Sequence, residues 1–192
     1  MVCTRVSAIV LALWAAAPGL AAADGSVRPV PHVDLTRYAG QWFEIARYPN
    51  WFQKKCAGDV AVIYSLNEDG RLTVDNRCRN ASGATERAVG VARLATNDGA
   101  NSRLKVRFAP AALSFLPFVW ADYWVIELAD DYSHAIVGTP SRDYLWFLAR
   151  TPTVSAEVYD ALVRAAAAQG FDTTRLQRTT NSGQVPAAGA AE

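Results

Sequence analysis

The 192-residue chain is poor in the residues that most often carry catalysis and metal binding. It has two histidines and three cysteines, and it lacks the Gly-x-Ser-x-Gly, His-Glu-x-x-His, Cys-x-x-Cys and glycine-rich phosphate-loop patterns. Those patterns mark serine hydrolases, zinc enzymes and nucleotide-binding enzymes. His32 and His134 are far apart and lie beside turn-forming residues, where a lone histidine is usually a surface residue. We therefore expect no enzymatic activity, no metal and no cofactor.

An excess of charge of either sign is also missing. The chain has 19 basic and 18 acidic residues, and removal of an N-terminal segment containing Arg5 would leave 18 of each. Proteins that bind nucleic acids by charge are usually strongly basic. The balance gives no indication of a nucleic-acid partner.

Long apolar runs are absent except near the N-terminus. Arg5 precedes the apolar run Val6–Ala17, and Pro18-Gly19 and three alanines follow it. This pattern is typical of a secretory signal peptide, here residues 1–23 with cleavage after Ala23, rather than of a membrane anchor. Cys3 precedes the run and is followed by no lipobox, so we expect no lipid anchor and a periplasmic or secreted protein.

Two cysteines, Cys56 and Cys78, remain after the signal peptide. They flank two predicted strands, Asp59–Leu66 and Arg71–Arg77, joined by a hairpin that brings their outer ends together. In an oxidising compartment we favour a Cys56–Cys78 disulfide. Two free thiols, with Cys56 as a possible nucleophile, remain the alternative.

Turn signals recur between short runs of β-branched and aromatic residues. They lie at 67–70, 80–83, 96–99, 129–132 and 139–142. Even spacing without intervening helices predicts an antiparallel up-and-down meander. One helix is predicted after Arg150, with Ser155 as its N-cap and Gly170 at its end. We expect it to pack outside the sheet.

The stretch Gly40-Gln-Trp42 predicts how the meander closes. A glycine before a tryptophan lets the chain turn sharply and places the large ring beneath the strand that follows. Arg150 ends the last predicted strand, and its guanidinium can stack on an aromatic face. Contact between Trp42 and Arg150 would make the first and last strands neighbours and close a barrel. The alternative role for Arg150 is an anchor for a ligand carboxylate.

These two stretches also carry a family resemblance. Gly40-x-Trp42 followed by Phe-Glu-Ile-Ala-Arg-Tyr-Pro-Asn, and Ser141–Thr153 with Arg150 near its end, resemble the first and last motifs of lipocalins, particularly the bacterial lipocalin and apolipoprotein D branch. The resemblance implies an all-β fold, an eight-stranded antiparallel up-and-down β-barrel with one C-terminal α-helix packed outside. We expect a lead-in at 24–32, the lipocalin domain at 33–180 and a disordered tail at 181–192.

Strand alternation predicts which side chains face the interior. Leu104, Val106 and Phe108 alternate with three basic residues that cannot all face an apolar interior. The same counting, with the lipocalin pattern, gives the expected ligand-binding residues: Val62, Tyr64, Val74, Leu104, Val106, Phe108, Tyr123, Val125, Tyr144 and Trp146. Ala88, Gly90 and Ala92 favour a cavity over a barrel filled by its own side chains.

The resemblance implies that the ligand is a small hydrophobic molecule, a fatty acid or a lysophospholipid, transported or stored in the bacterial cell envelope. A lipocalin-fold enzyme, an isomerase or hydrolase using Cys56, is the alternative. The segment Leu113–Trp120 is apolar, but Pro110 before it and Pro117 within it disfavour a strand. It could cover the barrel opening, contact a membrane surface or form a homodimer.

Overall fold

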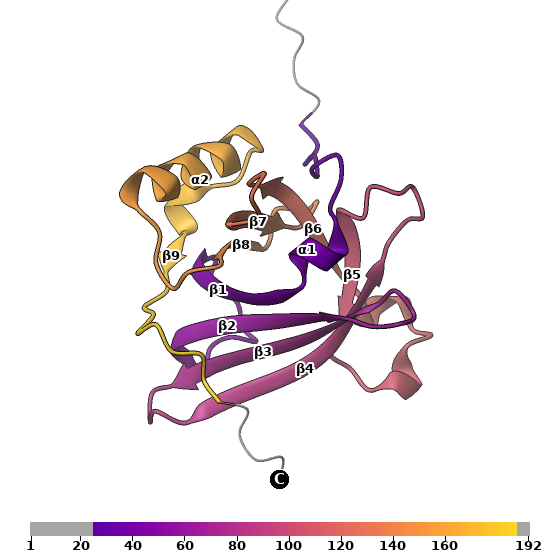
Figure 1. The fold of residues 1–192 in the computed structure, drawn as a ribbon, viewed down its shortest axis with the longest axis horizontal. Helices are drawn as coiled ribbons and strands as arrows, with labels where there is room; N and C mark the ends of the chain where they lie inside the picture. The colour runs from indigo at the N-terminus through magenta and orange to yellow at the C-terminus, as the bar shows by residue number, and fades with distance from the viewer. Residues whose placement is uncertain (1–24, 188–192) are drawn as a thin grey trace, which may run out of the picture.

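Runs of β-branched and aromatic residues, interrupted by glycine, asparagine and aspartate at the turns, fold into one closed sheet. The computed structural model describes residues 25–187, so the predicted signal peptide at 1–23 lies outside the described residues. Each of the eight barrel strands pairs antiparallel with the next along the chain, and the first also pairs with the eighth. The barrel strands are β1 (Gly40–Arg47), β2 (Cys56–Leu66), β3 (Leu72–Asn80), β4 (Thr85–Leu94), β5 (Arg103–Arg107), β6 (Ala121–Leu128), β7 (His134–Gly138) and β8 (Leu145–Ala149). The predicted eight-stranded antiparallel barrel is confirmed (Figure 1).

The two ends of the barrel differ. We call the end at which β1 begins the base and the opposite end the mouth. The short helix α1 (Leu35–Tyr38) lies at the base, capped by the Asp34 carboxylate, which accepts from the amides of Thr36 and Arg37. Because the strands alternate in direction, the loops at 48–55, 81–84, 108–120 and 139–144 lie at the mouth. The 108–120 loop contains the short 3-10 helices Ala111–Leu113 and Pro117–Val119.

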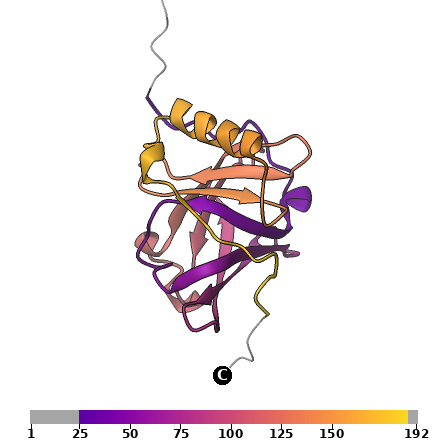
Figure 2. The same cartoon turned by 90° about the vertical axis from the view of Figure 1, so that its left-hand side faces the viewer.

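Apolar side chains pack on both faces of the sheet. One cluster faces the barrel interior and includes Trp42, Val62 and Leu104. A second cluster lies between the outer face of the sheet and helix α2 (Ala156–Ala168), which contributes Leu162 and Ala166. Figures 1 and 2 show α2 lying outside the barrel, beside β7 and β8.

The ends of α2 follow from local sequence signals. The Ser155 hydroxyl accepts from the Val158 amide at 3.3 Å, and Gly170 adopts a positive φ of 80° after the last turn. A side chain at Gly170 would also contact the Arg142 guanidinium. The predicted outer helix is confirmed.

The chain after α2 returns to the barrel wall. A 3-10 turn (Thr173–Arg175) leads to β9 (Gln177–Arg178), which pairs with β1. Pairing between β1 and β2 stops at Phe43 and Ala61. From there toward the mouth, the segment that follows β9 bridges the gap between these two strands. The Asp59 backbone amide donates to the Thr180 carbonyl at 2.9 Å, and the Asn181 side-chain amide donates to the Glu44 backbone carbonyl at 2.8 Å.

The first part of the expected tail at 181–192 makes contacts with the barrel, and residues 188–192 lie outside the described residues. The Ser182 amide donates to the Asp59 carboxylate, and Arg77 donates to the Pro186 carbonyl at 3.3 Å. Residues up to 187 therefore run along the outside of β2 and β3. These contacts satisfy polar groups of distant strands, and such contacts leave no periodic signal in the local sequence.

None of the helices in residues 25–187 is long and apolar enough to span a membrane. No cluster of three or more His, Cys, Asp or Glu side chains there could hold a metal ion.

Candidate ligand-binding site

Trp42 and Arg150 close the base as predicted. The Arg150 guanidinium carbon lies 3.9 Å from the centre of the Trp42 ring, and the indole N–H donates to the Tyr38 carbonyl at 2.8 Å. Gly40 has a φ of 93°, and a Cβ there would lie 3.3 Å from an Arg150 nitrogen. The glycine is therefore required both by its backbone conformation and by the close approach of the guanidinium.

The alternative role of Arg150 as a carboxylate anchor does not fit its hydrogen bonds. Its guanidinium donates to the carbonyls of Arg37 at 2.6 Å, Gln41 at 2.8 Å and Tyr132 at 3.3 Å. Trp42, which is fully buried, lies between this guanidinium and the interior apolar cluster. Arg150 therefore binds the chain segments of the base together.

Eight of the ten predicted ligand-binding residues belong to the interior cluster or pack against it. Val62, Tyr64, Val74, Leu104 and Val125 are buried in it, and Val106, Tyr123 and Trp146 are partly buried against it. Strand register explains the grouping: Tyr64 pairs with Val74, and Leu104 pairs with Tyr123. Pairs directly opposite each other project to the same face of a sheet.

Phe108 lies at the edge of the interior rather than within the wall. It is 45% exposed and follows the last residue of β5. Its ring lies over Gly90, where a Cβ would approach a ring carbon to 2.7 Å. Phe108 therefore lies at the rim of the inward face, because β5 ends one residue before it.

Tyr144 also lies at the rim, where it packs against Trp146. Their rings stack with centroids 5.8 Å apart and an interplanar angle of 9°. Phe52, from the 48–55 loop, contacts both rings, and the Trp146 indole donates to the Gln53 side chain at 3.0 Å. The loop thus folds over part of the mouth, while its neighbour Trp51 remains 72% exposed.

On β4, the accessibility of the inward face increases from base to mouth. On β4 the three small residues share the inward parity, and Ala92 is buried, Gly90 is intermediate and Ala88 is exposed. Val106 and Tyr123 also keep accessible surface although they pack against the interior cluster. A side chain that faces the inside of a closed barrel and still meets solvent borders a solvent-accessible space.

Three tyrosine hydroxyls meet near the base. The Tyr123 hydroxyl lies 2.7 Å from the hydroxyls of both Tyr38 and Tyr64. Burial raises the pKa of all three well above that of a free tyrosine, so they are neutral at physiological pH. Tyr38 was missed in the sequence because it precedes the first strand and has no strand parity. The Asp34 cap followed by a short helical turn was the only available signal.

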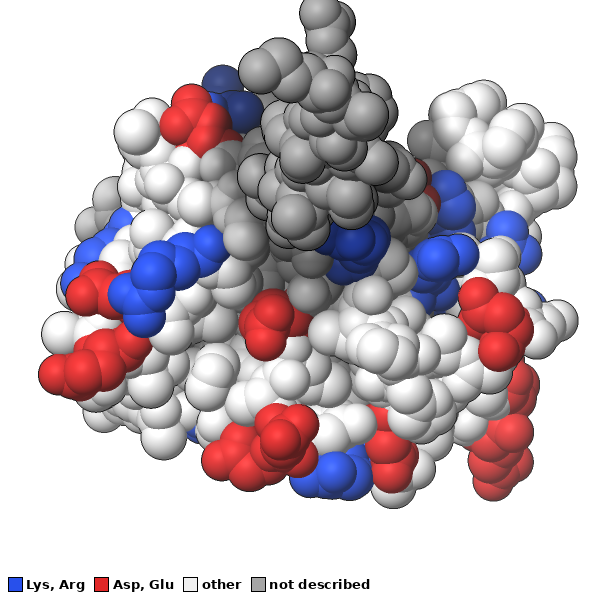
Figure 3. Space-filling model, turned by 90° about the horizontal axis from the view of Figure 1, so that it is seen from above, with Lys and Arg blue, Asp and Glu red and all other residues white. Residues whose placement is uncertain are grey.

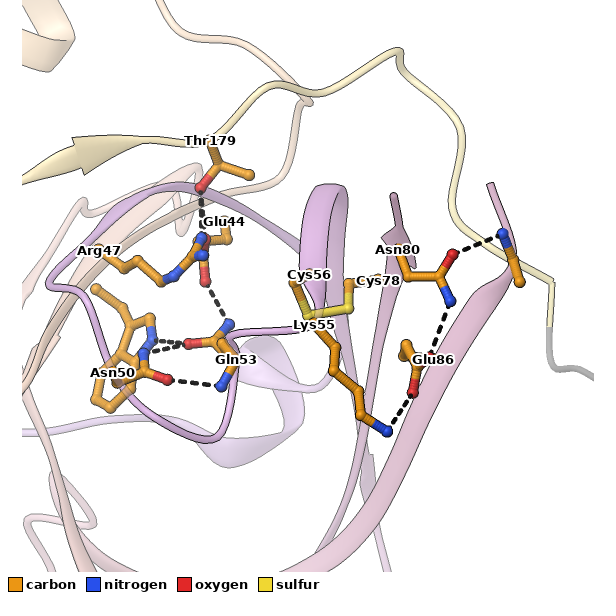
Figure 4. Close-up of a disulfide and its surroundings, with 12 residues drawn as sticks. Glu44, Arg47, Asn50, Gln53, Lys55, Cys56, Cys78, Asn80, Glu86 and Thr179 are labelled. Atoms are coloured by element: carbon orange, nitrogen blue, oxygen red, sulfur yellow. Dashed lines mark hydrogen bonds and ion pairs between the residues drawn. A yellow bond between two sulfur atoms is a disulfide. The ribbon is translucent and has the colours of Figure 1, made fainter. Parts of the chain in front are cut away.

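A buried ion pair at the bulge in β1 was also missed. Glu44 is 2% exposed, and its carboxylate accepts from Arg47 at 2.6 Å and from Gln53 at 2.8 Å, and also from Thr179 (Figure 4). The pair connects β1, the 48–55 loop and the C-terminal segment. Glu44 and Arg47 lie three apart on a strand, and only the register shift between Glu44 and Ala46 allows them to meet.

The cysteines form the predicted disulfide. Cys56 and Cys78 are joined with Cα atoms 5.5 Å apart, at the mouth ends of β2 and β3 (Figure 4). A disulfide fits an extracellular or periplasmic location. It also leaves Cys56 without the thiol that a nucleophilic role requires.

The 108–120 loop exposes several large apolar side chains. Phe115 is 77% exposed, Phe118 is 80% exposed and Leu113 is 40% exposed. Trp120 differs from them, because its ring lies against the guanidinium groups of Arg93 at 4.2 Å and Arg107 at 5.2 Å. The loop is therefore fixed to the outer barrel wall at one end, and its phenylalanines project away from it.

Charged side chains of both signs are interspersed on the surface. On the face shown in Figure 3, Lys and Arg alternate with Asp and Glu and do not gather into one patch. On the outer wall, Lys105 pairs with Asp122 at 2.7 Å. This arrangement agrees with the near-zero net charge of the chain.

A closed antiparallel barrel, blocked at one end by an indole beneath an arginine and lined with apolar side chains, defines a class of proteins that enclose small apolar molecules. The model of the lipocalin-like domain matches residues 33–181. The chain belongs to the lipocalin family, whose members bind and transport small hydrophobic ligands.

Several relatives cover most of the chain. Temperature-induced lipocalin-1 of Arabidopsis thaliana is 39% identical over 158 residues, which are 82% of this chain and 84% of that protein. The outer membrane lipoprotein Blc of Escherichia coli K12 is 39% identical over 151 residues, 78% of this chain and 80% of that protein. Apolipoprotein D of Macaca fascicularis is 30% identical over 155 residues, 76% of each chain.

Among solved structures, the fold is similar to insecticyanin from the tobacco hornworm Manduca sexta. The TM-score is 0.63 at 18% identity, with 83% of this chain and 87% of that chain covered. Apocrustacyanin C1 gives a TM-score of 0.61 at 16% identity, with 80% and 82% covered. At this identity, the likeness supports the barrel fold alone.

Proposed function

We propose that this lipocalin binds a fatty acid or a lysophospholipid in the barrel and carries or stores it in the bacterial cell envelope. The observation that carries the proposal is the inward face, which is mainly apolar, blocked at the base by Trp42 and Arg150, and accessible on β4 toward the mouth. Similarity to an outer membrane lipoprotein supports the envelope location.

The proposed lining consists of the interior and rim residues described above: Val62, Tyr64, Val74, Leu104, Val106, Phe108, Tyr123, Val125, Tyr144 and Trp146. Burial of each methylene of an acyl chain contributes about 0.8 kcal/mol. A chain of modest length can therefore reach micromolar affinity after the cost of association is subtracted.

The charged head group of such a lipid would remain at the mouth. Transfer of an unpaired ion into an apolar interior is costly. Lys54 and Lys55, both exposed in the 48–55 loop, provide cations close to the mouth. The proposed orientation is therefore acyl chain inward and head group outward.

The proposed location depends on the N-terminal segment. A signal peptide at 1–23, cleaved after Ala23, and the absence of a lipobox cysteine are consistent with a lipocalin domain at 33–180 released into the periplasm or outside the cell. The Cys56–Cys78 disulfide supports this compartment.

Mass spectrometry of an organic extract of the purified protein tests the proposal directly. We expect fatty acids or lysophospholipids in near-stoichiometric amounts, and displacement of a bound fluorescent fatty acid by hexadecanoic acid. An extract without lipid, together with no binding of the fluorescent fatty acid, would refute the proposal.

We also propose that Leu113–Trp120 contacts a membrane surface, with homodimer formation as the alternative. Phe115 and Phe118 are the most exposed large apolar side chains in the described part of the chain, and they lie at the mouth through which a lipid would pass. Liposome flotation should recover the parent but less of Phe115→Ser/Phe118→Ser. Equal flotation of both proteins, with light scattering that reports a dimer only for the parent, would favour the homodimer.

The enzyme alternative depends on Cys56. A thiol titration of the oxidised protein should find no reactive thiol from Cys56 or Cys78. Two reactive thiols would restore the alternative, a lipocalin-fold isomerase or hydrolase.

A further inference from the structure

The side-chain hydroxyls of the three tyrosines near the base form a hydrogen-bonded series, and in the described structure these hydroxyls bond only to one another. Tyr38 and Tyr64 each lie 2.7 Å from the central Tyr123 hydroxyl. The residues come from α1, β2 and β6, so their meeting depends on barrel closure. The rings of Tyr38 and Tyr64 also pack together, with centroids 5.5 Å apart.

A count of the hydroxyl hydrogens shows that one of them has no acceptor among the three tyrosines. Three hydroxyls carry three hydrogens, and the two hydrogen bonds use two of them. One hydroxyl hydrogen therefore always lacks an acceptor. It lies on Tyr38 or Tyr64, at either end of the series, or on Tyr123 at its centre. Rotation of the hydroxyls moves this hydrogen among the three positions without loss of a bond. It needs an acceptor from water or from a ligand, because an unpaired buried donor is costly.

The surroundings favour an acceptor without charge. The interior side chains packed around the hydroxyls include Val62, Val74, Leu104 and Val125. In the described part of the chain, the one charged side chain that acts electrostatically on any of the three hydroxyls is Arg150, and it acts on Tyr38. Arg150 is separated from the interior cluster by Trp42 and donates to backbone carbonyls. A carboxylate placed here would lose its hydration without gaining a cation. A hydroxyl, ketone or ester oxygen loses much less and can accept the free hydrogen.

We propose that Tyr38, Tyr64 and Tyr123 form a recognition site for a neutral oxygen at the end of the lipid that enters the barrel first. This inference rests on the proposed function and makes it more specific. The preferred ligand is an oxygenated lipid with a polar group at each end, its charged group at the mouth and its neutral oxygen at the base. A plain acyl chain would place a methyl group against the free hydroxyl hydrogen and displace any water that had accepted it.

Hexadecanoic acid and 16-hydroxyhexadecanoic acid test the proposal because they differ only at the end remote from the carboxylate. The dissociation constant of each is measured by displacement of a fluorescent fatty acid. In the parent, we expect the hydroxylated acid to bind at least as tightly as hexadecanoic acid. A hydroxylated acid that binds the parent more than ten-fold more weakly would overturn the proposal, since a buried hydroxyl without a partner carries a penalty of that order.

The informative variant replaces all three tyrosines by phenylalanine, Tyr38→Phe/Tyr64→Phe/Tyr123→Phe. Because the hydroxyls bond to one another, their joint removal leaves no polar group unpaired, and such exchanges can be nearly neutral for folding. We expect the preference for the hydroxylated acid over hexadecanoic acid to fall about five-fold. Tyr123→Phe alone should not lower this preference, because the substitution leaves the Tyr38 and Tyr64 hydroxyls free to donate to a ligand.

Tyr159→Phe is the matched control, because Tyr159 lies on α2 outside the barrel and contacts Phe147 and Arg178. Its ligand preference should equal that of the parent. An unchanged preference in the triple variant would refute the recognition site while leaving the lipid carrier intact. Failure of the parent to bind either acid would refute the proposed function instead.

Discussion

At the scale of single residues, Trp42 connects the base of the barrel to its interior. One face of its ring meets Arg150, and its N–H donates to the Tyr38 carbonyl. Its ring also packs against the Tyr38 ring, with centroids 4.9 Å apart and an interplanar angle of 36°. A single side chain thus links α1, β1 and the end of β8. A tryptophan suits the position because it offers a large apolar area, a cation-binding face and one donor.

We expect Trp42→Ala to lower the free energy of unfolding by about 3–5 kcal/mol, because it opens a cavity in a fully buried position. Chemical denaturation followed by circular dichroism measures the change. Trp51→Ala is the control, since Trp51 is 72% exposed and its loss should cost less than about 1 kcal/mol. Equal stability of the parent and Trp42→Ala would contradict the closure of the base by Trp42.

Val106 tests the interior wall at the same scale. Val106→Asp should abolish binding of a fluorescent fatty acid, because it places an unpaired carboxylate against the interior cluster. Ser65→Asp adds the same charge at an exposed position of β2 and should leave the affinity within about two-fold of the parent. Undiminished binding by Val106→Asp, in a protein that still folds, would remove Val106 from the lining.

At the scale of elements, charge pairs on the outer face reinforce the strand pairing of β3 with β4. Asp75 on β3 accepts from Arg77 at 2.6 Å and from Arg87 on β4 at 2.9 Å. Burial alone would raise the pKa of Asp75, but the hydrogen bonds from Arg87 and Arg77 outweigh it, and the pKa is lowered. The carboxylate therefore stabilises the folded state when it is ionised.

Because the pKa of Asp75 is lowered in the folded state, the stability difference between the parent and Asp75→Asn should depend on pH. A carboxyl whose pKa is lower in the folded state contributes stability above its unfolded pKa of about 3.9, and loses it as the pH falls through the folded pKa. The parent should therefore exceed Asp75→Asn in stability by a constant amount from pH 7 to about pH 5. The difference should shrink below about pH 4, as urea unfolding at each pH would show. A difference independent of pH down to pH 3 would contradict the ion-pair account.

Elements also differ in how far the sequence could predict them. The strands, the outer helix and the Cys56–Cys78 pairing followed from alternation, capping and a hairpin, which are local signals. The bridging segment at 179–187 did not, because its partners Glu44 and Asp59 are more than 100 residues away in the chain. The rim position of Phe108 depended on where β5 ends, and strand ends are set by tertiary packing as much as by propensity.

At the scale of the whole molecule, the interior is built from every barrel strand, so a bound ligand should stabilise the entire fold. A ligand that binds only the folded state adds about 2.7 kcal/mol at 100 times its dissociation constant. For a domain of this size, that corresponds to a rise in Tm of about 5–10 °C.

Differential scanning calorimetry with and without hexadecanoic acid measures this rise. Val106→Asp should show no rise at the same concentration, which separates specific binding from a general effect of lipid. An unchanged Tm of the parent at saturating hexadecanoic acid would mean that the acid does not bind within the barrel.

The sequence by itself determined the barrel and how it closes. Strand alternation fixes which side chains can share a face, and the Gly40-x-Trp42 turn and Arg150 carry the chemistry of the base in a few residues. Only the tertiary structure decided which polar groups meet. The tyrosine series, the Glu44–Arg47 pair and the C-terminal bridge join residues from separate elements, since hydrogen-bond geometry depends on distances of a few tenths of an ångström that only the closed barrel sets.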